Sequence, residues 1–154
     1  MKHFSISTEM IDSDALRESL SDPTTGASVV FEGLVRNHHE GRDVQRLEYE
    51  VYAPLAEKEG LKIIAEAAGL YPFEKAVCVH RSGLLEIGEC AVWVGVSSAH
   101  RDEAFKACRY IIDEAKHRLP IWKKEYYTDG DAQWVNCQRC AEHGTEHDQA
   151  QKHA

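Results

Sequence analysis

Several features that define whole classes of proteins are missing from this chain of 154 residues. No apolar run approaches the roughly 20 residues that a membrane span requires. The N-terminus, MKHFSISTEM, lacks the basic and apolar stretches of a secretory signal peptide. We therefore expect a cytoplasmic protein without membrane association, and we expect its five cysteines to stay reduced.

Basic charge is also scarce. The chain has 18 lysines and arginines against 26 aspartates and glutamates, which gives a net charge of −8. This balance argues against a general nucleic-acid binder, because such a surface needs a basic field. A local cluster of basic side chains in so acidic a protein is then informative, since it suggests a pocket for a small anion or for the acidic tail of a partner.

Familiar catalytic and cofactor motifs are absent as well. The sequence has no glycine-rich loop of the Walker or dinucleotide kind and no nucleophile elbow. Ligand types that bind zinc occur near the C-terminus, but the loop between their pairs is much shorter than in common zinc modules; they are Cys137, Cys140, His143 and His147. We expect no metal, no cofactor and a polar, disordered tail over residues 137–154.

The pattern of apolar residues predicts a single α+β domain over residues 1–136, with a mixed or antiparallel sheet and two main helices. The hydrophobic content of 43% is enough for one core but not for a second large domain. We expect strands at 3–6, 27–36, 45–52, 75–83, 90–98, 122–128 and 132–135, with the last two forming a hairpin through Asp129 and Gly130. The strand at 45–52 is expected to pair with the one before it.

Helices are predicted at 13–20, at 54–68 and in the stretch that follows His100. In the second helix the predicted apolar positions are Leu55, Leu61, Ile64, Ala65 and Ala68. In the third, apolar residues recur at steps of three and four and should face the core; they are Phe105, Cys108, Ile112, Ala115 and Leu119. Pro120 should end this helix near Leu119, because the residue before a proline is pushed out of the α region.

Basic side chains lie at both ends of this third helix. His100 and Arg101 are at its start, where free backbone N–H groups and the helix dipole favour an anion, and Lys116 is near its end. At 1.5 Å per residue, these ends are roughly 24 Å apart, which is too far for one small ligand to touch both. Either the chain has two sites, or one site is assembled from two copies, which a two-fold dimer would do twice.

Three further basic residues are candidates: Arg36, Lys123 and Lys124. A lone lysine or arginine is most often a solvated surface charge, and the stem of Lys116 could simply cover apolar surface. Arg36 and the pair His100 and Arg101 nevertheless follow long apolar strands directly, and binding sites are often built at such strand ends. The positions therefore favour a functional reading.

Several separated segments carry a resemblance to a known family; they are FEGLVRNHHEGRDV, LEYEVY, VHRSGLLEIGE, VGVSSAHRDEAF and AKHRLPIWKKE. In order and spacing, these segments closely resemble the large, catalytic subunits of molybdopterin synthase, over residues 26–135. The resemblance implies an α/β-hammerhead-like fold and a sulfurtransferase of molybdenum cofactor biosynthesis. Such an enzyme converts cyclic pyranopterin monophosphate, or precursor Z, to molybdopterin by installing two sulfurs as a dithiolene.

Partners are implied in the same way. In that family the sulfur arrives as a thiocarboxylate on the C-terminal Gly-Gly of a small ubiquitin-like sulfur-carrier subunit. A homodimer of large subunits, with one small subunit at each end, makes a heterotetramer. This chain ends in QKHA, so we expect the sulfur donor to be a separate chain.

The resemblance also implies roles for individual residues. Lys116 and Lys123 match the catalytic lysines, and Lys116 is the one nearest the incoming thiocarboxylate. The other matching substrate-binding residues are Leu34, Val35, Arg36, His100, Arg101, Lys124 and Glu125. Phe31 and Ile112 match a wall of the site or of the partner interface, although Ile112 stands where a methionine is common. The matched positions hold no cysteine, so we expect no persulfide chemistry on this chain.

Two other functions remain open at this point. A non-catalytic module could use the same basic groove to dock an acidic protein tail, and loss of Lys116 would then only weaken partner binding. A sensor of a phosphate ligand would need His100 and Arg101 but not the lysines.

Overall fold

The computed structural model describes residues 1–136, which form one α+β domain, as the sequence predicts. In chain order the elements are β1 (Lys2–Ser7), α1 (Ser13–Ser19), β2 (Ala27–Leu34), β3 (His38–His39), β4 (Arg42–Val51), α2 (Ala53–Leu70), β5 (Lys75–Arg81), β6 (Gly83–Glu86), β7 (Cys90–Ser98), α3 (Arg101–Arg118), β8 (Ile121–Tyr127) and β9 (Ala132–Asn136). Within these residues, no helix is both long enough and apolar enough to cross a membrane.

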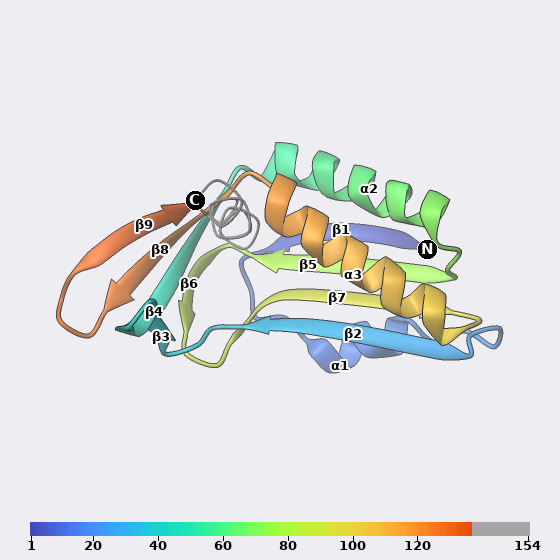
Figure 1. Cartoon of the computed structure of the whole chain (residues 1–154), viewed down its shortest axis with the longest axis horizontal. Coiled ribbons are helices and arrows are strands. Elements are labelled where there is room, and N and C mark those ends of the chain that lie inside the picture. Colours follow the sequence, from blue (N-terminus) through green and yellow to red (C-terminus); the bar gives the residue numbers. More distant parts are fainter. Residues whose placement is uncertain (137–154) are drawn as a thin grey trace, which may run out of the picture.

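The first sheet has the order β1-β5-β7-β2. Its β1 and β5 are parallel, and the other pairs are antiparallel. Figure 1 shows α2 and α3 side by side over one face, and α1 lies on the other. The main core lies under α2 and α3, and a smaller core around Trp93 and Leu20 lies under α1. The apolar, β-branched sequences of β5 and β7 suit this burial on both faces.

The second sheet has the order β3-β4-β8-β9, with β6 also paired to β4. The expected pairing of β4 with β2 is wrong, because β2 pairs with β7 and β4 pairs with β6 and β8. The chain instead turns back on itself at Glu40 and Gly41, whose φ angles are 49° and 78°. Two successive positive φ angles suit a tight hairpin, so β3 becomes the neighbour of β4 that precedes it in sequence. The β8–β9 hairpin is confirmed.

The helices lie where the sequence predicts them, but their buried faces differ. In α3, Phe105 is 61% exposed, contrary to the prediction that it faces the core. The buried residues are instead Ala104, Ala107, Cys108, Ile111, Ile112 and Ala115. In α2, Leu55 and Leu61 are exposed, whereas Ala56, Gly60, Ile63, Ile64 and Ala67 are buried. More than half of the residues on each buried face are small, which lets the helix approach the sheet closely, and small residues carry little hydrophobic signal of their own.

Candidate active site

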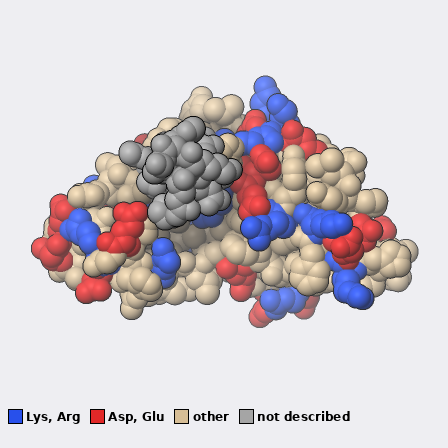
Figure 2. Space-filling view, in the orientation of Figure 1, with Lys and Arg blue, Asp and Glu red and all other residues tan. Residues whose placement is uncertain are grey.

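A basic pocket lies where the two sheets meet, and we call it the lysine pocket. Its volume is about 190 Å³, and its lining comes from β2, β3, β4, α3, β8 and the loop after β2. The lining residues are Leu34, Arg36, His38, His39, Leu47, Tyr49, Lys116, Lys123 and Glu125. Over the face seen in Figure 2, basic and acidic side chains are interspersed, so this gathering of Arg36, Lys116 and Lys123 is a local feature.

Strand register explains the composition of one wall. In the antiparallel pair of β4 and β8, Leu47 lies opposite Glu125 and Tyr49 lies opposite Lys123. Directly opposite residues share a face of the sheet, and successive residues alternate between faces. The side chains of Lys123 and Glu125 therefore point into the pocket, on the same side of the sheet as Leu47 and Tyr49. The prediction that Leu47 and Tyr49 share one face of β4 is confirmed.

Lys124, also expected at the site, does not line the lysine pocket of this chain. It lies between Lys123 and Glu125 on β8, so its side chain belongs to the opposite face of the strand. There its Nζ is 5.0 Å from the centroid of the Tyr126 ring and 5.5 Å from that of Trp134. The amine is thus placed among aromatic rings, in cation–π contacts.

A buried carboxylate sits within the basic lining. Glu125 is only 1% exposed, and its Oε1 is 2.7 Å from Nδ1 of His39. The carboxylate lies in the same pocket wall as Lys116 and Lys123, so it partly offsets their charges. Sequence reasoning missed His38 and His39, which it assigned to a polar loop tip; the only available signal was two adjacent histidines before a tight turn.

Lys116 lines the lysine pocket and also a small second cavity. That cavity is shared with His80 from β5, another residue that sequence reasoning missed. Burial, and after it the charge of Lys116, lower the pKa of His80 to about 4. The imidazole beside Lys116 is therefore neutral near pH 7.

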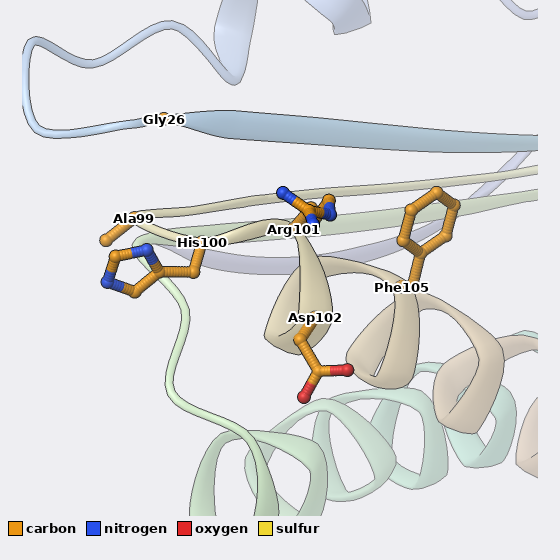
Figure 3. A pocket seen from close by; sticks show the side chains of 6 residues that line it. All are labelled: Gly26, Ala99, His100, Arg101, Asp102 and Phe105. Carbon is orange, nitrogen blue, oxygen red and sulfur yellow. The ribbon is translucent and has the colours of Figure 1, made fainter.

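A second basic pocket lies at the start of α3, and we call it the helix-start pocket. Its volume is about 480 Å³, and it is lined by Gly26, Ala99, His100, Arg101, Asp102 and Phe105. Figure 3 shows the side chains of Arg101 and Phe105 extending from α3 toward β2, whereas the side chain of Asp102 points away from β2. Asp102 is paired with Lys106, whose Nζ is 2.9 Å from its Oδ2. His100, Arg101 and the first backbone N–H groups of α3 thus remain as the features that suit an anion.

The two pockets are separated by the length of α3. Arg101 begins this helix and Lys116 lies in its last turn, so the continuous helix keeps them roughly 22 Å apart. Within the described residues, the two residue sets line different cavities. Assembly of one site from two copies of the chain is compatible with this geometry and stays a prediction.

The four remaining candidates lie in different surroundings. Leu34 is 59% exposed at the end of β2 and lines the lysine pocket, whereas Val35 is buried in the main core. Phe31 is partly exposed on β2, the edge strand of the first sheet. Ile112 is buried and lines the small cavity that contains His80. Their roles in binding stay predictions.

Comparison with known proteins decides the family. The family model described as MoaE protein matches residues 6–118, which include every lining residue of both pockets except Lys123 and Glu125. The chain belongs to the MoaE protein family. This membership confirms the resemblance seen in the sequence.

Individual MoaE relatives match most of the chain. The molybdopterin synthase catalytic subunit of Nostoc sp. is 39% identical over 142 residues, covering 92% of this chain and 86% of the relative. The molybdopterin synthase catalytic subunit of Staphylococcus carnosus is 44% identical over 139 residues, covering 90% of this chain and 92% of the relative. The crystal structure of molybdopterin synthase from Staphylococcus aureus superimposes with a TM-score of 0.82 at 41% identity, covering 88% of this chain and 98% of that chain.

In residues 1–136, no group of three or more histidine, cysteine, aspartate or glutamate side chains is arranged to hold a metal ion. Cys137, Cys140, His143 and His147 lie outside the described residues, as does the tail predicted to be disordered. Both expectations for that segment stay predictions.

Proposed function

We propose that this chain is the catalytic subunit of a molybdopterin synthase, an enzyme of molybdenum cofactor biosynthesis. It converts precursor Z to molybdopterin by transferring two sulfurs from the thiocarboxylated C-terminus of a small ubiquitin-like subunit. Membership in the MoaE family supports the enzyme role, since its relatives are molybdopterin synthase catalytic subunits. The observation that carries the proposal is that Arg36, Lys116 and Lys123 line one pocket although they come from three separate parts of the chain.

The chemistry of the pocket suits two anionic reactants. A thiocarboxylate and a substrate phosphate repel each other, and cationic side chains offset that repulsion. Arg36 offers a planar fork for bidentate binding, whereas Lys116 and Lys123 offer compact charges. A lysine amine also exchanges protons, so Lys116 and Lys123 supply and remove protons while sulfur adds to the pterin side chain and oxygen leaves.

The phosphate of the substrate is held by His100 and Arg101 of a second copy of the chain. Support comes from the separation of roughly 22 Å along α3, which keeps the helix-start pocket away from the lysine pocket of the same copy. A two-fold dimer brings the start of one helix to the end of the other and creates two equivalent sites. One small subunit at a time then serves each site, and two thiocarboxylates in succession supply the two sulfurs.

The described cysteines support an external source of sulfur. Burial raises the pKa of Cys108 and of Cys90 to about 11, and it raises the pKa of the fully buried Cys78 further. Thiolate is the reactive form of cysteine, so these three thiols are poorly suited to carry a persulfide at neutral pH. None of them lines the lysine pocket.

Replacement of Lys116 separates catalysis from docking. We expect Lys116→Ala to bind the small subunit nearly as the wild type does, but to form product about 10²- to 10⁴-fold more slowly, because a proton-transfer group is lost. The measurement is single-turnover product formation from precursor Z and thiocarboxylated small subunit, after partner affinity has been determined. Lys62→Ala, an exposed lysine on α2, is the matched control and should behave as the wild type.

Each alternative function predicts a different result for the same variants. A docking module would show weaker partner binding by Lys116→Ala and no product from the wild type. A phosphate sensor would be unaffected by Lys116→Ala and would lose ligand binding in Arg101→Ala. Full activity of Lys116→Ala would contradict the proposed role of this lysine.

A further inference from the structure

His80 is a buried histidine immediately behind the lysine pocket. On β5 it lies on the same face as Ala76 and Cys78, which face the main core under α2 and α3. It is 5% exposed, and its ring meets the ring of Tyr49 edge-on, with 5.0 Å between centroids. Tyr49 lines the lysine pocket and His80 does not. His80 therefore supports the pocket wall from within the core.

The hydrogen bond of His80 fixes which ring nitrogen carries its proton. Its Nδ1 is 2.7 Å from the backbone carbonyl oxygen of Arg81, and a carbonyl can only accept, so Nδ1–H is the donor. Burial and the charge of Lys116 lower the pKa of His80 to about 4, so the ring carries no second proton near pH 7. Its Nε2 is consequently an unprotonated acceptor.

His80 and Lys116 line the same small cavity. The other residues that line it are apolar: Val92, Ile112, Ala115, Leu119 and Ile121. Its volume of about 10 Å³ corresponds to about one water molecule. The titratable groups that face His80 from the elements packed against β5 are Lys116 on α3 and Tyr49 on β4.

We propose that His80 is a positioning residue for Lys116. Its unprotonated nitrogen accepts a hydrogen bond from the Lys116 ammonium, directly or through one water in the shared cavity, and this holds the amine in the lining of the lysine pocket. A neutral imidazole suits this task, because a charged ring would repel the ammonium. The inference rests on the proposed function, in which Lys116 is a reacting group.

Two substitutions separate the tasks of the two ring nitrogens. The amide of His80→Asn lies near the position of Nδ1 and can still donate to the Arg81 carbonyl. The longer amide of His80→Gln lies near Nε2 and can still accept from Lys116. We expect His80→Asn to be the more stable variant but the slower enzyme, with a single-turnover rate about tenfold below the wild type. His80→Gln should be less stable and yet faster than His80→Asn.

The affinity for precursor Z should change less than twofold in both variants, because His80 does not line the lysine pocket. Urea unfolding gives the stabilities, and titration of the single-turnover rate with substrate separates affinity from rate. A purely structural role predicts that the rates follow the stabilities, with His80→Asn above His80→Gln. That order would overturn the proposal.

A second readout does not depend on catalysis. An acceptor near Lys116 favours its protonated form, so its loss should make the amine react faster with an acylating reagent. We expect His80→Asn to raise the acylation rate of Lys116 about tenfold at pH 8, measured by peptide mass mapping, with Lys62 unchanged as an internal control. An unchanged Lys116 rate would overturn the role of His80. If His80→Asn shows the faster acylation of Lys116 but the wild type forms no product from precursor Z, the proposed function is contradicted and the role of His80 is not.

Discussion

At the scale of single residues, the site combines groups that sequence reasoning finds with groups that it misses. Arg36, Lys116 and Lys123 stand out because an acidic chain has few reasons to gather cations at strand and helix ends. His80 and His39 do not stand out, because their importance comes from partners far away in sequence. His39 meets Glu125 across 86 positions, and a buried histidine in an apolar strand resembles ordinary core.

The buried imidazole of His80 predicts how stability changes with pH. The pKa of His80 is about 4 in the folded chain against an ordinary value of 6.5 when unfolded. Below about pH 6.5 the unfolded chain therefore binds a proton that the folded chain does not, and the free energy of unfolding falls until about pH 4. Between pH 7 and pH 5 the titration of His80 should lower the free energy of unfolding of the wild type by about 2 kcal/mol.

Urea unfolding at both pH values measures this loss. His80→Asn cannot titrate, so its stability should decrease less between pH 7 and pH 5, by about 2 kcal/mol. His38→Asn removes an exposed histidine and serves as the control. An identical pH dependence of the wild type and His80→Asn would show that folding does not lower the pKa of His80.

At the scale of elements, positions follow from the sequence better than faces and partners do. Pro120, the β-branched runs and the turn at Gly130 act locally, so they fix where α3, β7 and the β8–β9 hairpin lie. The buried faces of α2 and α3 depend on how closely each helix approaches the sheet. Small residues make that approach possible, and a pattern of large apolar residues does not reveal it.

Two glycines of α2 test this account of helix packing. A Cβ on Gly60 would lie 2.3 Å from the ring of Phe4 on β1, whereas a Cβ on Gly69 would meet nothing within 4 Å. Gly60→Ala should therefore lose about 1–3 kcal/mol of stability through overpacking. Gly69→Ala should gain up to about 1 kcal/mol, because alanine favours the helix. Thermal and urea unfolding measure both, and equal effects would mean that α2 does not pack closely through Gly60.

At the scale of the whole molecule, the single α+β domain and its family follow from the sequence, but the arrangement of the strands in two sheets does not. Local patterns predict each strand, whereas β2 finds its partner β7 only through long-range packing. The same limit applies to the site. The sequence predicts that α3 keeps His100 and Arg101 apart from Lys116. In the structure, these residues line two different pockets at the two ends of α3.

The proposed dimer predicts complementation between two inactive variants. In a heterodimer of one Arg101→Ala chain and one Lys116→Ala chain, one composite site carries both changes and the other carries neither. Heterodimers isolated with two different tags should therefore have about half of the wild-type activity per dimer, although each variant alone is nearly inactive. Activity no greater than the mean of the two homodimers would mean that each site is built from a single chain.

The central claim is that this chain moves sulfur from a protein thiocarboxylate to a pterin. The most direct measurement is a single-turnover reaction in which the thiocarboxylate of the small subunit carries a heavy sulfur isotope and the pterin product is analysed by mass spectrometry. We predict that both sulfurs of the dithiolene carry the label, and that little labelled product forms with Lys116→Ala. Product without the label, or no product from a wild-type chain that binds the labelled small subunit, would contradict the claim.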